Sequence, residues 1–313
     1  MRLVCISDTH NSHKGLQLPD GDVLIHAGDA TGQGLTLEIE RFLTWFSTQP
    51  HRYKIFVAGN HDWLFQRHPE MSAQLLAAYP GITYLQDSGI EIEGVKFWGS
   101  PWQPWFLDWA FNLPRGGSAI REVWNKIPIS TEVLITHGPP HGILDQVRGG
   151  THLGCEELKL RLAAVRPRVH VFGHIHDAYG VAQSNTAVYV NGCSCDENYR
   201  PTHRPIVLDL YPESIDIHGI EPNQRLESLE QIQSVLNETG DGLLEKVPYD
   251  LFSTQLSGLL TMAEIRGIDA TALLQEYVTR GLQSDLARHL RSENRPSKRQ
   301  IPHAWLANEH GER

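Results

Sequence analysis

Five short polar clusters recur along this chain, and four of them directly follow a run of apolar, β-favouring residues. In chain order the clusters are Asp8-Thr9-His10, Gly28-Asp29, Gly59-Asn60-His61-Asp62, Thr136-His137-Gly138 and Gly173-His174-Ile175-His176. Open α/β sheets place ligand-binding groups just beyond the carboxyl ends of their strands, where loops converge. The sequence therefore predicts an α/β fold that gathers carboxylate, amide and imidazole groups at one edge of a sheet.

The strands and helices expected from the apolar pattern occupy the chain as far as about residue 220. Short β-branched runs predict strands, and apolar residues at helical spacing predict helices. The expected strands are 3–7, 23–27, 55–58, 90–92, 96–98, 133–136, 169–172, 187–191, 206–210 and 214–217, and the expected helices are 37–46, 71–79 and 155–165. Because so many strands exceed one parallel sheet, we expect a four-layer α/β/β/α sandwich of two mixed sheets with helices outside.

The composition changes after residue 220, where β-rich runs give way to amphipathic helical patterns. We therefore expect a catalytic domain over 1–220, a helical C-terminal extension over 221–290 and a polar tail over 291–313. The extension either pairs two subunits into a homo-oligomer or clamps the catalytic domain, and the sequence leaves both roles open.

Charge and apolar pattern exclude several classes of protein. A formal net charge of −10 makes nucleic acid a disfavoured partner, because broad binding to it depends on Lys and Arg. A small phosphorylated substrate stays compatible, since bound dications reverse the field locally. No run reaches the roughly 18–20 apolar residues of a membrane span, and the first residues are typical of a strand, so we expect a soluble, cytoplasmic protein. The four cysteines show no metal or disulfide spacing and should be reduced.

The donor types in the five clusters indicate a metal centre. Imidazole and carboxylate together suit borderline divalent ions such as Mn, Fe, Zn, Co or Ni. The carboxylate of Asp29 can bridge two ions, and Asn60 offers a neutral carbonyl oxygen. Alternation along an extended segment would send Asp8 and His10 to the same side. Two ions roughly 3.5–4 Å apart are a known device for displacement at phosphorus, so these residues predict a two-metal phosphoesterase.

The five clusters resemble, in order, the DxH, GD, GNH(D/E), H and GHxH motifs of the calcineurin-like metallophosphoesterases. The resemblance covers residues 3 to about 210, and segments 102–106 and 112–116 are similar to the metallophosphoesterase-domain-containing subfamily, whose members resemble class III cyclic-nucleotide phosphodiesterases. It implies two divalent ions, with Mn first in order, and a hydroxide between them that attacks phosphorus in line. One ion would take Asp8, His10, Asp29 and His176, and the other Asp29, Asn60, His137 and His174.

The resemblance also implies roles for residues around the ions. His61 is similar to the family's general acid, which protonates the leaving oxygen, and Asp62 would orient and charge that imidazole. We expect Arg115, Asn112 and Asn11 at the substrate, with a surface salt bridge as the alternative for Arg115. An aromatic group either stacks on a nucleobase or packs in the core. Its members are Trp98, Trp102, Trp105, Phe106, Trp109 and Phe111.

Together these features predict a metal-dependent phosphoric diester hydrolase that acts on nucleotide-type phosphodiesters, cyclic nucleotides included. The second cluster continues as Ala30-Thr31-Gly32, without the Asp-Arg-Gly of phosphoprotein phosphatases, so protein phosphatase activity is not expected. Two alternatives stay open. One is a nuclease on RNA or DNA ends, steered by the basic residues of 288–313, and the other is a non-catalytic, metal-stabilised interaction module.

Overall fold

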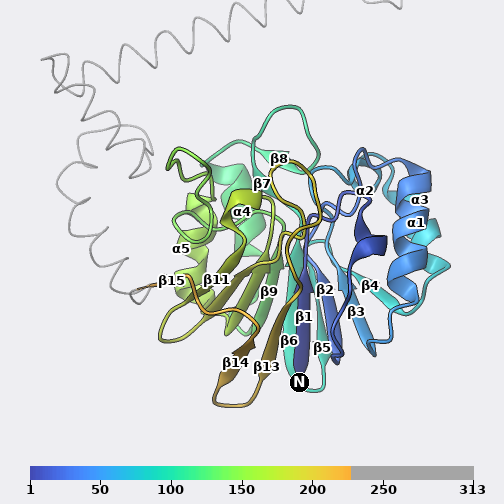
Figure 1. The fold of residues 1–313 in the computed structure, drawn as a ribbon. Helices are drawn as coiled ribbons and strands as arrows, with labels where there is room; N and C mark the ends of the chain where they lie inside the picture. The colour runs from blue at the N-terminus through green and yellow to red at the C-terminus, as the bar shows by residue number, and fades with distance from the viewer. Residues whose placement is uncertain (227–313) are drawn as a thin grey trace, which may run out of the picture. The chain divides into compact units, whose positions relative to one another are not determined.

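Two mixed β-sheets pack against each other in the computed structural model, which describes residues 1–226 (Figure 1). The strands of the first sheet are β1 (Arg2–Ile6), β2 (Val23–His26), β3 (Tyr53–Phe56), β4 (Ile82–Tyr84), β13 (Ile206–Leu210) and β14 (Ile215–His218). Those of the second are β5 (Ser88–Ile92), β6 (Val95–Ser100), β9 (Val133–Thr136), β10 (Val169–Phe172), β11 (Gly180–Gln183), β12 (Val188–Asn191) and β15 (Gln224–Arg225). Their spatial orders are β14-β13-β1-β2-β3-β4 and β15-β11-β12-β10-β9-β6-β5.

Helices cover the outer faces of both sheets. They are α1 (Thr36–Ser47), α2 (Trp63–Arg67), α3 (Pro69–Ala77), α4 (Ser118–Asn125) and α5 (Glu156–Val165), with short 3₁₀ turns η1 (His13–Gly15) and η2 (His176–Ala178). A small separate pair joins β7 (Gln103–Pro104) to β8 (Asn112–Leu113). In Figure 1, α1 and α3 flank the first sheet, and α4 and α5 flank the second.

Alternation along the strands builds three layers of core. Leu3 and Cys5 of β1 belong to the core between the sheets, whereas Val4 and Ile6 pack with α1 on the outer face. Strand β9 divides its side chains in the same way between the inner core and the cluster under α4 and α5. This is the period of two that a strand buried on both faces requires. The predicted α/β/β/α sandwich is therefore confirmed.

The two sheets are joined at the edge where their parallel strands end. Ser7 follows β1, and its N–H donates to the carbonyl of Gly192, just after β12, at 2.8 Å. The N–H of Ser194 donates back to the carbonyl of Ser7 at 2.8 Å. Because β1, β2 and β3 run parallel, as do β6, β9, β10 and β12, the carboxyl ends of both sets of strands meet at this edge.

The second sheet continues past the domain boundary that the sequence suggests. Strand β15 pairs with β11 through residues 224 and 225, beyond residue 220. The rest of the expected extension (221–290) and the expected tail (291–313) lie outside the described residues, so their roles stay predictions. Within residues 1–226, every helix is too short or too polar to cross a bilayer.

Candidate metal centre and active site

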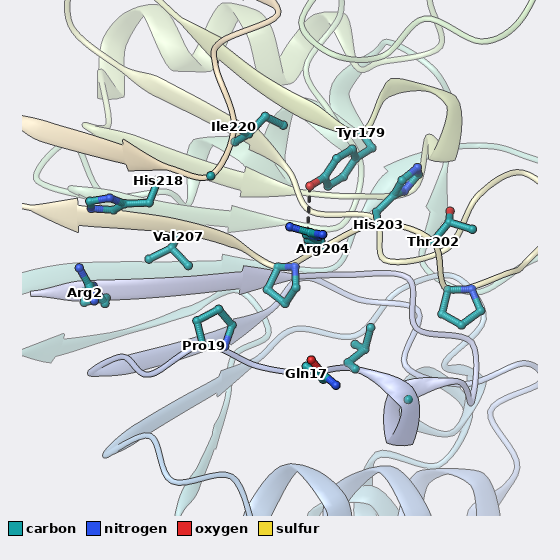
Figure 2. Close-up of a pocket in the computed structure, with 15 residues that line it drawn as sticks. Arg2, Gln17, Pro19, Tyr179, Thr202, His203, Arg204, Val207, His218 and Ile220 are labelled. Carbon is teal, nitrogen blue, oxygen red and sulfur yellow. Dashed lines mark hydrogen bonds between the residues drawn. The ribbon is translucent and has the colours of Figure 1, made fainter.

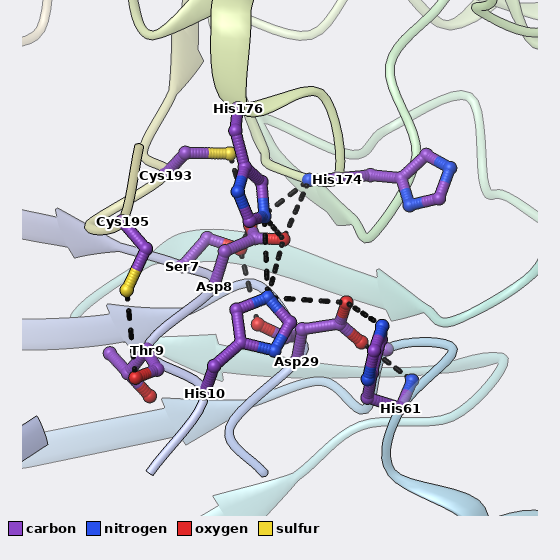
Figure 3. Close-up of polar contacts among 12 residues, drawn as sticks. Ser7, Asp8, Thr9, His10, Asp29, His61, His174, His176, Cys193 and Cys195 are labelled. Carbon is purple, nitrogen blue, oxygen red and sulfur yellow. Dashed lines mark hydrogen bonds and ion pairs between the residues drawn. The ribbon is translucent and has the colours of Figure 1, made fainter. Parts of the chain in front are cut away.

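The structure brings all seven predicted metal-donor residues to the shared edge of the two sheets. Figure 3 shows five of them, Asp8, His10, Asp29, His174 and His176. Six of them form two groups, and the ligand atoms within each group lie within 4.8 Å of one another. The first group is Asp8, His10 and His176, and the second is Asp29, His137 and His174. The Asn60 amide oxygen lies 2.9 Å from His137 Nε2 and so joins the second group. Asp29 also approaches His10, with 3.8 Å between carboxylate and Nε2, so one carboxylate connects both groups.

The donor side chains reach the centre because several of these residues have a left-handed backbone conformation, and not because side chains alternate along an extended segment. Asp8, His10, Asp29 and His174 have φ values of 51°, 39°, 55° and 68°. The predicted extended segment over Asp8 and His10 is therefore wrong, although both side chains still reach one site. Non-glycine residues in this region cost of order 1 kcal/mol or more each, and such outliers cluster at functional sites. A Cβ at Gly173 would lie 1.9 Å from Asp8 Oδ2, so only glycine fits beside that carboxylate.

The imidazoles are oriented as metal ligands require. In His10, His176 and His137, Nδ1 lies within hydrogen-bond distance of a backbone carbonyl and therefore carries the proton. Those carbonyls belong to Thr31, Asp196 and Ala27, at 3.2, 2.8 and 3.0 Å. Each Nε2 then faces the centre, where the Nε2 atoms of His10 and His176 are only 3.2 Å apart. Burial would lower the pKa of His176, but Asp8 raises it to about 9, so a proton can lie at this nitrogen, and a divalent cation could take its place because imidazole and carboxylate are its usual ligands.

The protonation states of the carboxylates and imidazoles at this centre decide how well it can bind cations. Burial alone would raise the pKa of Asp29, but His137 and His61 beside it hold that pKa well below its usual range. Burial would lower the pKa of His137, yet the Asp29 carboxylate 3.4 Å away outweighs it and raises the pKa to about 9. Burial of His174 lowers its pKa to about 3, which leaves a neutral imidazole. The centre therefore holds ionised carboxylates and at least one free imidazole lone pair.

Two residues that the sequence did not indicate hold Asp8. The Ser7 hydroxyl donates to Asp8 Oδ2 at 2.5 Å, and the Cys193 thiol donates to the same oxygen at 3.2 Å. The N–H of His174 donates to that carboxylate at 3.0 Å. Cys193 is one of four free, buried cysteines, as expected from the sequence.

His61 lies beside the centre, where it forms a third group of possible ligands with His10 and Asp29. Its Nε2 is 3.9 Å from Asp29 Oδ2, and its ring stacks on Trp109 with centroids 4.0 Å apart. Its Nδ1 bonds to the carbonyl of Gly32 at 2.7 Å. Asp62 does not take the predicted role of orienting this imidazole. Its carboxylate accepts backbone N–H groups of Gly59, Ala30 and Thr31 and the Thr31 hydroxyl, so it fixes the loops that carry Asp29 and Asn60.

A cavity of about 450 Å³ opens over the donors. Its walls combine donor residues with loop residues, among them Trp105, Phe106, Arg115, Glu197 and Tyr199. An acidic and histidine-rich floor under a rim of aromatic and charged side chains suits a phosphoryl group with organic substituents.

The chain's first 178 residues match the family described as calcineurin-like phosphoesterase. The chain belongs to this family. Metallophosphoesterase domain-containing protein 1 of Homo sapiens is 45% identical over 231 residues, which cover 67% of this chain and 71% of the relative. UPF0046 protein K07C11.7 of Caenorhabditis elegans is 38% identical over 220 residues, covering 66% and 74%. A solved crystal structure with 15% identity has a TM-score of 0.53 over 70% of this chain and 99% of that one, a likeness of fold alone.

Calcineurin-like phosphoesterases use divalent metals to hydrolyse phosphoesters, and the two donor groups of this phosphoesterase fit that chemistry. Of its other predicted site residues, some line the cavity and others do not. The Arg115 guanidinium lines the cavity but bonds to Glu156 at 2.8 Å and to the carbonyl of Gly154 at 2.8 Å, as the salt-bridge alternative foresaw. The Asn11 amide donates to Glu38 at 2.7 Å and lies outside the cavity walls.

In this phosphoesterase, Asn112 supports a loop, some of the aromatic residues line the cavity, and others pack in the core. The Asn112 amide donates to the carbonyls of Phe106 and Leu107 at 3.1 Å each and so stabilises their loop. Asn112 is not among the residues that line the cavity. Trp105 and Phe106 line the cavity, whereas Trp102 packs edge-on against buried Phe111. Core packing therefore holds for Trp102 and Phe111, and stacking of Trp105 or Phe106 on a nucleobase stays a prediction.

Tyr199 lines the phosphoesterase cavity and belongs to no motif. Its ring lies edge-on to His10, with centroids 4.8 Å apart. Nothing in its neighbourhood in the sequence marks it as part of the site, because its position depends on a turn after β12 that carries no recognisable spacing.

A larger groove of about 1020 Å³ lies elsewhere on the phosphoesterase (Figure 2). Its walls include Arg2, Tyr179, His203, Arg204 and His218. Within residues 1–226, the donor groups include no residue of this groove, so the smaller cavity is the candidate active site.

Proposed function

We propose that this phosphoesterase hydrolyses nucleotide-type phosphodiesters, cyclic nucleotides among them, with two divalent metal ions, of which Mn²⁺ is the first to test. The observation that carries the proposal is the Asp29 carboxylate shared between two imidazole-rich donor groups. Asp8, His10, Asp29 and His176 would hold one ion, and Asp29, Asn60, His137 and His174 the other. Such ions supply positive charge for phosphoryl oxygens and lower the pKa of a bound water.

The chain's own groups would do the rest of the work. His61 has Nδ1 fixed by the Gly32 carbonyl, so its Nε2 is the atom that would give a proton to the leaving oxygen. The Trp109 ring stacked on it restricts its rotation. The aromatic surface of the rim supports the proposal of a flat, nucleoside-like substituent.

The test is hydrolysis of bis(p-nitrophenyl) phosphate and of a panel of 2′,3′- and 3′,5′-cyclic nucleotides by the full chain with Mn²⁺, Zn²⁺, Co²⁺ and Ni²⁺. We expect close to two ions per chain, activity with Mn²⁺, and a large loss of rate in Asn60→Ala. A folded, metal-loaded sample that is inactive on every substrate would overturn the proposal. Partner binding that survives Asn60→Ala, without hydrolysis, would instead indicate an interaction module.

A further inference from the structure

Two exposed aromatic rings flank the centre, one beside each donor group. Tyr199 lies edge-on to both imidazoles of the first group, with its centroid 4.8 Å from His10 and 5.4 Å from His176. Phe106 lies edge-on to His174 of the second group, with centroids 5.8 Å apart. Both rings line the cavity, and the two residues are 53% and 44% exposed, so each keeps a large face open.

The fold fixes the place of Tyr199 tightly. Asp196 Oδ1 accepts the N–H groups of Asn198 and Arg200 at 2.9 and 3.0 Å, and the Arg200 guanidinium donates to its second oxygen. The carbonyl of Asp196 accepts the N–H of Tyr199 at 2.9 Å and also holds His176 Nδ1 at 2.8 Å. Tyr199 adopts a φ of 60°, which is unfavourable for a bulky residue. One turn thus positions a metal-donor imidazole and an aromatic wall together.

The loop that presents Phe106 is braced in a comparable way. The Asn112 side chain accepts the N–H of Phe106 at 3.4 Å and donates to its carbonyl at 3.1 Å. Strands β7 and β8 close the base of this loop. Leu107, next to Phe106, has a φ of 50°. Both rings are therefore held by built turns at fixed places beside the donors.

We propose that Tyr199 and Phe106 contact the two substituents of an acyclic phosphodiester, one ring for each substituent, so that acyclic diesters with two flat substituents bind more tightly than those with one. A cyclic nucleotide carries a single nucleoside and can engage one ring only. The inference rests on the proposed phosphodiester hydrolysis and adds the residues that decide substrate choice. A phosphoryl group at the junction of the two donor groups carries its substituents outward toward both rings. A phosphomonoester has one ester group and can engage one ring only. Contact between a flat substituent and an aromatic ring should raise the binding affinity about fivefold.

The test measures binding, separately from turnover, on the Mn²⁺-loaded full chain. Diphenyl phosphate, methyl phenyl phosphate and dimethyl phosphate are titrated by calorimetry, since phenolate and methoxide leave slowly. The preference is the Kd of methyl phenyl phosphate divided by that of diphenyl phosphate. We expect Tyr199→Ala and Phe106→Ala each to lower this preference about fivefold, because methyl phenyl phosphate can still use the remaining ring. The double variant should bind all three ligands alike.

Matched variants separate the ring from other effects. Tyr199→Phe keeps the ring and should keep the preference. Tyr211→Ala removes an equally exposed tyrosine outside the cavity and should change nothing. Metal content and thermal unfolding are measured for every variant, and both are expected to match the wild type.

The inference is overturned if both alanine variants keep the wild-type preference, if Tyr199→Phe loses it as Tyr199→Ala does, or if Tyr211→Ala lowers it equally. Hydrolysis of bis(p-nitrophenyl) phosphate by the wild type is followed in parallel. Hydrolysis with an unchanged preference in the variants would overturn this inference alone. Ring-dependent binding without any hydrolysis would overturn the proposed function alone.

Discussion

The metal-donor residues and the rim of the cavity are fixed by different features of the fold. Donors such as Asp8 and His137 are fully buried and sit directly after strands, where backbone groups of both sheets hold them. Rim residues such as Tyr199 and Arg115 come from loops and are held by contacts between loops or within one turn. Sheet geometry therefore brings most of the donors together, whereas the rim depends on which loops meet, and the turn at Asp196 links the two by holding both His176 and Tyr199.

Of all the changes, replacement of Asp29, whose carboxylate both donor groups share, should have the largest effect. Asp29→Asn keeps the shape of the side chain but removes the charge that both donor groups share. Loss of a residue next to a ligand costs about 10–100-fold, so loss of this ligand should lower kcat/KM for bis(p-nitrophenyl) phosphate by more than about a hundredfold. Bound Mn²⁺ should fall in the same sample. Asp216→Asn, an exposed change on β14, is the matched control, and wild-type metal content and rate in Asp29→Asn would contradict the assignment.

The residues that hold Asp8 should show the next largest effect. Ser7→Ala removes the 2.5 Å hydrogen bond to Asp8, and Mn²⁺ affinity should fall about tenfold, measured by metal titration. Cys193→Ser replaces one donor to the same oxygen by another and should leave the affinity close to that of the wild type. Equal Mn²⁺ affinity in Ser7→Ala and the wild type would show that Asp8 needs no such support.

The same comparison explains how much of the molecule the sequence predicts. All seven donors are predictable because each follows an apolar strand, and strands 133–136, 169–172 and 206–210 have the expected bounds. Short elements such as α2 and β4 were missed, because five or three residues carry too little periodicity. The contacts of Asp62, Asn112 and Tyr199 depend on which loops meet in the folded protein. No local sequence pattern predicts which loops these are.

Arg115 tests the rim side of the comparison, with a smaller effect. Its guanidinium ties the β8–α4 segment to Glu156 and to the carbonyl of Gly154. Arg115→Met should lower the free energy of unfolding by about 1–3 kcal/mol, since it leaves a carboxylate and carbonyls unpaired. Glu156→Gln should lower it too, and the double variant should lose less than the sum. Urea denaturation measures this coupling. A KM that rises tenfold in Arg115→Met but not in Glu156→Gln would instead place Arg115 on the substrate.

His13 shows where the donor centre ends along the chain. It lies three residues after His10, yet both of its ring nitrogens are buried without a hydrogen-bond partner, and its ring packs near Phe42 and Trp45. Burial lowers the pKa of His13 to about 4, whereas the ordinary histidine value is near 6.5. The imidazole is thus a packing group and must stay neutral in the folded protein.

This pKa gives the smallest predicted effect, and its sign follows from linkage. The unfolded chain binds a proton at His13 below pH 6.5, whereas the folded protein does so only near pH 4. The stability due to neutral His13 is therefore complete above pH 6.5 and is lost as the pH falls toward 4. His13→Phe should lose about 1–2 kcal/mol less unfolding free energy than the wild type between pH 7 and pH 5, measured by urea denaturation. The exposed His68→Gln should behave as the wild type. An unchanged pH dependence in His13→Phe would mean that His13 takes up a proton in the folded protein as readily as in the unfolded chain.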